Sequence, residues 1–351
     1  MGFLVSLLVF SFLIFFHELG HYLVARFFGV RVEVFSIGFG KKIISKKIGE
    51  TQWSFSLIPL GGYIKMKGQD DSDPTKISYD DDSYSVKTPW QRIVISLAGP
   101  MANFILAFLL YLSIASIGVP KLLSTVGDIN HSNPAYLAGM RAGDNVYSIN
   151  GEAIHYWEDI TSNIKQEAIP IAITIEREGE YIDFNIIPKE QKLHNRFGEE
   201  VQRYIIGIRP DINAIEVVDF GLMGSVDYAY EQTKMASTYI VQSVKKLISG
   251  LIPMENLGGV IGIVDTTEKV THMGVVSLLA FMALISVNLG VLNLLPIPAL
   301  DGGHIMFNLY EMITKKSPNE KIMYKLTLIG WALLLTLMLL GVYNDINRLL
   351  G

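Results

Sequence analysis

Four stretches of the chain are apolar over lengths that could cross a membrane, and they restrict the possible folds more than any other feature of the sequence. They lie at about residues 2–25, 93–118, 274–297 and 325–343. A helix rises about 1.5 Å per residue, so about 20 apolar residues span the roughly 30 Å of hydrocarbon in a bilayer. Backbone polar groups in that layer must be paired within the protein, which favours helices. The sequence therefore predicts a polytopic α-helical membrane protein with about four transmembrane helices.

The composition supports an architecture that is part membrane and part aqueous. Half of the 351 residues are hydrophobic and 18% are charged, which is too apolar for an ordinary soluble protein and too charged for a chain that lies wholly in the bilayer. The net charge is -5 and no basic stripe alternates with aromatic residues, so we expect no nucleic-acid partner. The chain has no cysteine, which excludes disulfides, thiolate metal ligands and a cysteine nucleophile.

Lysine and arginine are concentrated in two of the connections between the apolar stretches. Residues 26–92 contain eleven of them, and the connection at 304–325 adds a further cluster of lysines: Lys315, Lys316, Lys321 and Lys325. Because cytoplasmic loops of membrane proteins carry an excess of basic residues, both connections are predicted to lie in the cytoplasm. Segment 119–273 and both termini then lie on the opposite side. The first stretch lacks the basic start and the small-residue cleavage site of a signal peptide, so we expect a retained helix.

Strand patterns occur on both sides of the membrane. On the cytoplasmic side, residues 30–43 and 51–68 alternate between apolar and polar, and strands so close to a bilayer must pair with each other or line a protein-enclosed cavity. On the other side, residues 171–187 alternate around a turn and predict a hairpin. Residues 133–154 predict a short helix, a strand and a tight turn, in a pattern that resembles the PDZ family. A PDZ domain is an α+β fold whose groove adds an extended peptide to a sheet edge. An unrelated small β domain is the alternative.

These patterns divide the chain into four parts. Residues 1–118 would form the first half of a membrane core, 119–190 a PDZ domain, 191–273 a connecting segment and 274–351 the second half of the membrane core. Within the connecting segment, apolar residues recur at helical spacing over 221–250. This spacing predicts an amphipathic helix that lies on the membrane surface or packs on the outer domain.

The first apolar stretch contains three ionisable side chains, His17, Glu18 and His21. Residues i and i+4 of a helix lie about 40° apart around its axis, so both imidazoles can face one ion. This is the H-E-x-x-H arrangement, in which two histidines bind Zn²⁺ and the glutamate is the general base of a metalloprotease. Each charged group in mid-membrane costs about 2.5–3.5 kcal/mol, and a bound metal would compensate. Alternatively, the two histidines hydrogen-bond within a helix bundle and Glu18 lies at the aqueous boundary.

A third ligand is expected from another apolar stretch, because catalytic zinc usually has three protein ligands and a water. In the segment 287–305, Pro296 and Pro298 interrupt an apolar helix and Asp301 follows them. A helix broken in this way could turn the carboxylate inward. We favour Asp301 as the third ligand, with His304 as its competitor.

Motifs spread over nearly the whole chain carry a resemblance to a known family. They are HELGH (17–21), GFG (38–40), PLGGYIKMKG (59–68), AGPMANF (98–104), the PDZ pattern and NLGVLNLLPIPALDGGH (288–304). With these motifs the chain resembles the site-2 proteases, which are intramembrane zinc metalloproteases, and most closely their bacterial RseP-like branch. The best-known members of that branch have two tandem PDZ units where one is visible here, and Val260 stands where a proline is common.

The resemblance implies a metal site and a mechanism. His17, His21 and Asp301 would bind one Zn²⁺ per chain, and Glu18 would be the catalytic base. The ion would lower the pKa of its bound water to about 7 and polarise a peptide carbonyl. Glu18 would take the proton of the water and pass one to the leaving nitrogen.

The resemblance also implies residues that hold the substrate. Asn288 and Asn293 would position it, while Gly38, Phe39 and Gly40 would belong to a membrane-dipping β-hairpin on the cytoplasmic side that holds an unwound substrate strand. From the residues alone, the two asparagines could equally serve packing between helices.

The implied partners are the lipid bilayer and single-pass membrane proteins, such as anti-sigma factors and remnant signal peptides. The implied location is the bacterial cytoplasmic (inner) membrane, with the active site toward the cytoplasm and the PDZ domain on the periplasmic side. Whether the PDZ groove would bind a new C-terminus or exclude bulky outer domains stays open. Two other functions are a non-catalytic PDZ adaptor in the membrane and an ion carrier that uses His17, Glu18, His21 and Asp301 as a relay, although four spans without an internal repeat suit a carrier poorly.

Overall fold

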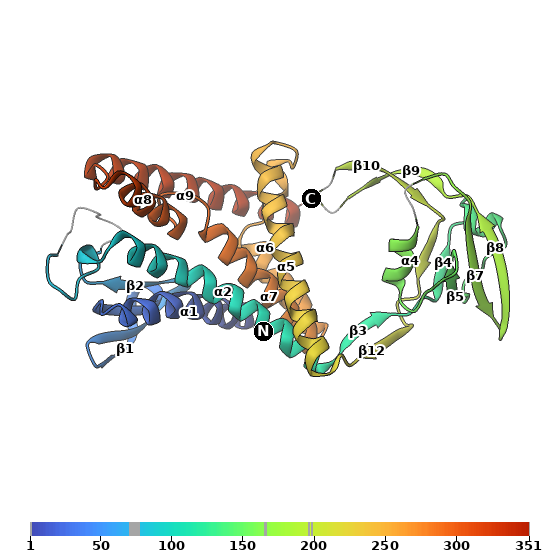
Figure 1. Ribbon diagram of the computed structural model, residues 1–351, viewed down its shortest axis with the longest axis horizontal. Coiled ribbons are helices and arrows are strands. Elements are labelled where there is room, and N and C mark those ends of the chain that lie inside the picture. The colour runs from blue at the N-terminus through green and yellow to red at the C-terminus, as the bar shows by residue number, and fades with distance from the viewer. Residues whose placement is uncertain (1, 70–77, 165–166, 196, 198, 351) are drawn as a thin grey trace. The chain divides into compact units, whose positions relative to one another are not determined.

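The computed structural model describes residues 2–69, 78–164, 167–195, 197 and 199–350. The chain divides into two compact units (Figure 1). The first is formed by Met1–Ile114 with Leu222–Gly351, and the second by Ala115–Gly221. The second unit is therefore an insertion in the sequence of the first.

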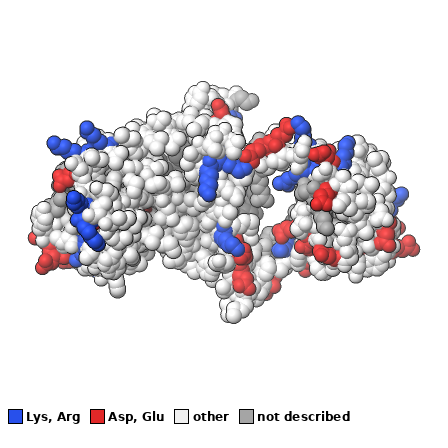
Figure 2. Space-filling view, turned by 45° about the horizontal axis from the view of Figure 1, so that its top comes forward, with Lys and Arg blue, Asp and Glu red and all other residues white. Residues whose placement is uncertain are grey.

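Helices form most of the first unit. Within the described ranges, four are long and apolar enough to cross a membrane: α1 (Gly2–Phe27), α2 (Pro89–Ile117), α7 (Val275–Asn293) and α9 (Glu320–Leu350). They coincide with the four predicted stretches, apart from shifts at their ends. Figure 2 shows a broad surface of this unit without charged side chains. Both observations are compatible with the predicted helical protein with several membrane spans.

The connection between α1 and α2 contains a long hairpin. Strand β1 (Val32–Ile48) pairs antiparallel with β2 (Thr51–Met66), which confirms that the two predicted strands pair with each other. Residues 34–37 of β1 are registered against both 52–55 and 62–65, so the start of β1 lies between the two ends of β2. A buried apolar cluster at the end of α1 contains Val32, Met66, Tyr84 and Ile95. This cluster fixes the hairpin against α1 and α2.

Shorter elements complete the first unit. They are the 3-10 turns η1 (Tyr84–Val86) and η2 (Met254–Asn256) and the helices α5 (Gly221–Ile248), α6 (Val260–His272) and α8 (Asp301–Thr314). Helix α5 covers the predicted amphipathic segment. Helix α7 ends at Asn293, and α8 begins after the two prolines of the predicted break. The 304–325 segment, predicted as a connection, is thus helical at 304–314 and again at 320–325.

An aspartate of α9 that is distant in the sequence caps the N-terminus of α6. The N-cap residue of α6, Gly259, offers no side chain for capping. The backbone N–H groups of Gly259 and Gly262 donate instead to the Oδ2 atom of Asp345, at 3.0 and 2.8 Å. The first N–H groups of a helix have no partners within it. This carboxylate therefore provides the capping acceptor that the local sequence lacks, and it links α6 to α9.

The second unit combines short helices with several small sheets. Its helices are α3 (Pro134–Leu137) and α4 (Trp157–Asn163). The largest sheet has the strand order β6-β5-β7-β8, with β5 (Asn145–Ile149), β6 (Glu152–Ala153), β7 (Ile171–Arg177) and β8 (Glu180–Ile186). Strands β7 and β8 form the predicted hairpin. Asn150 and Gly151 both have positive φ, as the predicted tight turn requires.

Three two-stranded sheets complete this unit. They pair β3 (Val119–Leu122) with β12 (Ile215–Val218), β4 (Val126–Ile129) with β11 (Ile208–Pro210), and β9 (Lys189–His194) with β10 (Glu200–Ile205). The core contains Met140, Ile149, Ile160, Ile173 and Ile175, none more than 1% exposed. The unit therefore continues past residue 190 to Gly221, although the sequence predicted a connecting segment from 191 onward.

Candidate active site

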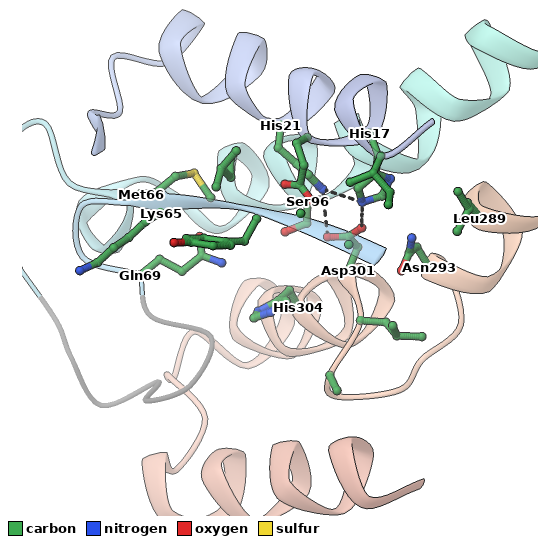
Figure 3. Close-up of a pocket in the computed structure, with 18 of the residues that line it drawn as sticks. His17, His21, Lys65, Met66, Gln69, Ser96, Leu289, Asn293, Asp301 and His304 are labelled. Atoms are coloured by element: carbon green, nitrogen blue, oxygen red, sulfur yellow. Dashed lines mark hydrogen bonds and ion pairs between the residues drawn. The ribbon is translucent and has the colours of Figure 1, made fainter. Parts of the chain in front are cut away.

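The three residues predicted as metal ligands lie together in the wall of a cavity. His17 and His21 extend from α1 toward Asp301 at the start of α8 (Figure 3). The Nε2 atoms of the two histidines are 3.2 Å apart. Each faces one carboxylate oxygen of Asp301, His17 at 3.2 Å from Oδ2 and His21 at 3.2 Å from Oδ1. Two segments some 280 residues apart in sequence thus meet with all their ligand atoms directed at one another.

The distances fit a tetrahedral zinc site. Ligand atoms bound tetrahedrally at about 2.0–2.1 Å from a zinc ion are about 3.3–3.4 Å from one another. The Oδ2 atom of Asp301 is also buried without a hydrogen bond, because the His17 nitrogen lies within ion-pair distance of it but outside hydrogen-bond geometry. A buried carboxylate oxygen in that state is costly unless a cation is bound. Two imidazole nitrogens and a carboxylate form a donor set that Zn²⁺ accepts.

Helix α2 contacts the other nitrogen of each imidazole. The Nδ1 atom of His21 donates to the backbone carbonyl of Ile95 at 2.8 Å. A proton on Nδ1 leaves the Nε2 lone pair of His21 available to a metal. The Nδ1 atom of His17 lies 3.0 Å from the side-chain amide of Asn103. Helix α2 therefore contacts both rings through their Nδ1 atoms, the nitrogens that do not face Asp301.

Glycines allow α1 and α2 to approach this closely. A Cβ atom at Gly99 would lie 2.1 Å from Nε2 of His21, and one at Gly20 would lie 2.3 Å from the carbonyl oxygen of Ala98. Contacts between nonbonded heavy atoms are ordinary only from about 3.4 Å. The His21 ring can therefore occupy its position only because residue 99 has no side chain.

Glu18 shares the cavity with the three ligands. The cavity has a volume of about 660 Å³ and is lined by residues of α1, β2, α7, α8 and α9. Glu18 is 9% exposed and faces the hairpin, where a Cβ at Gly62 would lie 3.2 Å from its Cγ. Glu18 therefore lines the same cavity as the three ligands, where a carboxylate could serve as a general base.

The other predicted site residues divide into two groups. Asn293 and Phe39 line the cavity, and Figure 3 shows Asn293 on the side of Asp301 away from Lys65. Asn288, Gly38 and Gly40 are not among its lining residues. His304, the predicted competitor of Asp301, also lines the cavity but does not belong to the ligand cluster.

Some lining residues were not predicted as part of the site. The edge of β2 contributes a continuous run, 61–66, and α2 and α9 contribute Ser96 and Trp331. The run lies in the PLGGYIKMKG motif, so its paired glycines were a usable signal. No periodicity in the sequence points to Asn103 or Trp331, because each reaches the site through packing between distant helices.

Comparisons with known proteins identify the family of the chain. The sequence matches the model of Peptidase family M50 over residues 5–337. A Campylobacter jejuni protein named "Putative zinc metalloprotease" is 45% identical over 349 residues, which cover 99% of this chain and 94% of that protein. A Helicobacter pylori protein of the same name is 39% identical over 353 residues, covering 99% and 100%. The regulator of sigma-W protease RasP of Bacillus subtilis is 29% identical over 421 residues, covering 98% and 97%. The chain therefore belongs to Peptidase family M50, the site-2 protease family, and is a zinc metalloprotease.

Proposed function

We propose that the protein hydrolyses peptide bonds within or near the transmembrane segments of single-pass membrane proteins. The observation that carries this proposal is the meeting of His17, His21 and Asp301 beside Glu18, in a cavity of a unit whose long helices are apolar enough to span a membrane. Ionisable groups at such depth are costly and therefore point to function. A soluble substrate would not require an active site among helices that span a membrane.

The proposed chemistry divides between the metal and the chain. One Zn²⁺ per chain, held by His17, His21 and Asp301, would lower the pKa of a water to about 7 and polarise the scissile carbonyl. Glu18 accepts a proton from the attacking water and then donates it to the leaving nitrogen. Asn293, which lines the same cavity, donates hydrogen bonds to the substrate backbone. The apolar walls of the cavity limit access of other water.

An extended substrate segment would lie against the hairpin. A helical substrate has its amides closed by internal hydrogen bonds, so it must unwind before it can be cut. Residues 61–66 of β2 lie along the cavity and can pair with the unwound strand, which offsets part of the lost hydrogen bonding. A Cβ at Gly61 would lie 2.1 Å from the Phe39 ring, and one at Gly62 would lie 2.6 Å from the Ile14 side chain. Gly61 thus lets β2 pass close to Phe39 of β1, and Gly62 lets it run close to α1.

The proposed setting is the bacterial cytoplasmic membrane, with the active site toward the cytoplasm. The basic residues of the 26–92 and 304–325 segments support this orientation. The name of the RasP relative, regulator of sigma-W protease, supports membrane-bound anti-sigma factors as one substrate class. Remnant signal peptides, as short apolar helices, would suit the same cavity.

We propose that the second unit is a PDZ domain on the extracytoplasmic side. Within this unit, a cavity of about 380 Å³ lies between α4 and the segment 204–209. Trp157 and Ile160 line it from the helix, and Ile206 and Ile208 line it from the opposite wall. An apolar groove between a helix and a strand edge is the form in which PDZ domains receive an extended peptide.

The test compares the membrane proteomes of cells that carry the parent protein, Glu18→Gln or the surface control Glu158→Gln, whose side chain is 76% exposed. Glu18→Gln removes the proton acceptor while keeping the size of the side chain. Uncut single-span fragments are expected to accumulate with Glu18→Gln and not with the control. Identical profiles for all three would contradict the proposal.

A further inference from the structure

Asn103 is a buried polar residue that the proposed chemistry does not use. It lies on α2 with no exposed surface. Its backbone carbonyl accepts a hydrogen bond from the Ser286 hydroxyl of α7 at 2.8 Å, which fixes this part of α2 relative to α7. Its side-chain nitrogen lies 3.0 Å from Nδ1 of His17, and its side-chain oxygen is buried without a hydrogen bond. A buried amide oxygen in that state loses its hydrogen bond to water without a replacement, so it calls for an explanation.

The two faces of this amide match the two tautomers of His17. With the nitrogen toward Nδ1, the amide donates to the ring, and the ring proton must lie on Nε2, directed at the Nε2 atom of His21. A metal at Nε2 excludes that proton, which must then lie on Nδ1 and requires an acceptor. Rotation of the Asn103 amide by 180° brings its oxygen to Nδ1. Either orientation leaves one amide atom without a partner among the described residues, so the rotation costs little.

We infer that Asn103 is a positioning residue for the zinc site, whose amide oxygen accepts the Nδ1 proton of His17 and thereby directs Nε2 to the metal. The inference rests on the proposed function. With this role, both histidine ligands have an acceptor on α2 for their Nδ1 proton. The Ile95 carbonyl accepts from Nδ1 of His21, and the Asn103 amide oxygen would accept from Nδ1 of His17. Helix α2, which supplies no ligand itself, would set the ring orientation of both histidines.

The test measures zinc retention in the full-length protein, purified in detergent and dialysed against buffers of graded free zinc. Asn103→Leu removes the acceptor, and Asn103→Asp keeps an acceptor of the same shape. Asn344→Leu is the control, because Asn344 is also a buried asparagine, 5% exposed, and donates to the carbonyls of Met254 and Leu257 away from the metal site. Zinc per chain is read by elemental analysis, independently of cleavage.

Loss of a residue that orients a ligand typically weakens metal binding about 10- to 100-fold. We therefore expect Asn103→Leu to need that much more free zinc for half occupancy, while Asn103→Asp and Asn344→Leu stay near the parent. Parental retention by Asn103→Leu would overturn the inference. So would a 10- to 100-fold loss in Asn103→Asp relative to the parent, and this arm decides the matter if the leucine variant fails to fold.

Failure of the proposed function would look different from failure of this inference. A parent protein that holds no zinc at any free concentration, or a Glu18→Gln variant that still cleaves, would remove the proposed chemistry and the inference with it. A parent that binds zinc and cleaves, alongside an Asn103→Leu variant with unchanged zinc retention, would remove only the role of Asn103.

Discussion

Replacement of Gly99 by alanine should disable the site from a position that is not itself a ligand. The new Cβ would lie 2.1 Å from Nε2 of His21 and 2.6 and 2.7 Å from the neighbouring ring carbons. The His21 ring or helix α2 must move by about the 1.3 Å that separates 2.1 Å from an ordinary 3.4 Å contact. Metal-ligand distances tolerate only about 0.2 Å, so His21 would leave the ligand set unless the backbone of α2 shifts instead.

The expected effect on cleavage follows from that displacement. Misplacement of a catalytic group by 1 Å can cost about 10²-fold in rate. We expect Gly99→Ala to cleave a purified single-span reporter at least about 100-fold more slowly than the parent and to retain less zinc. The backbone effect has the opposite sign, because alanine favours a helix interior over glycine by about 1 kcal/mol. A loss of activity can therefore be assigned to the steric clash.

The matched control is Gly258→Ala, where no atom lies within 4 Å of the added Cβ. It should cleave and bind zinc as the parent does. If Gly99→Ala keeps activity and zinc content within twofold of the parent, then α1 and α2 can separate without disturbing His21. That result would refute the argument that residue 99 must be glycine to form the site.

Two further predictions concern the metal and the second unit. Dialysis of the purified protein against a strong chelator should abolish reporter cleavage and leave its helical circular dichroism unchanged. Added Zn²⁺ should then restore cleavage. Persistent activity in metal-free protein would count against the mechanism. In the second unit, Asp144 is 1% exposed and accepts from Nε and Nη2 of Arg177 at 2.7 and 2.8 Å and from the Arg141 backbone at 2.7 Å. Asp144→Ala should therefore destabilise this unit by about 3 kcal/mol. The measurement is hydrogen exchange in the full chain, which should become roughly 100-fold faster in β7. Unchanged exchange would show that the ion pair contributes little to stability.

The parts of the site that depend on local sequence were predictable. The spacing of His17 and His21 on a helix determines that both rings face one side, whatever surrounds them. Pro296 and Pro298 each remove a backbone donor and together favour a break in a helix, which made Asp301 the favoured third ligand. Long apolar stretches likewise form helices in a bilayer because the backbone has no other way to pair its polar groups there.

The parts that depend on packing were not predictable. Gly99 and Asn103 matter because α2 lies against α1, and no pattern within either segment reveals that pairing. Strands β9 and β10 expose most of their side chains, so they lack the apolar alternation that reveals a strand. Helix α6 begins at a glycine without a capping side chain and takes its cap from Asp345, some 85 residues later in the sequence. Such long-range compensation leaves no local signal.

The break between α7 and α8 has an electrostatic consequence. Asp301 is the first residue of α8, so its carboxylate lies at the positive end of a helix macrodipole, beside N–H groups that have no partners within the helix. A negative charge there is stabilised by about 0.3–1 kcal/mol at exposed sites and by more where the surroundings are apolar. The same interruption that aims the acid inward also favours its anionic form. The backbone turn that positions this ligand therefore also supplies part of the electric field that keeps it charged.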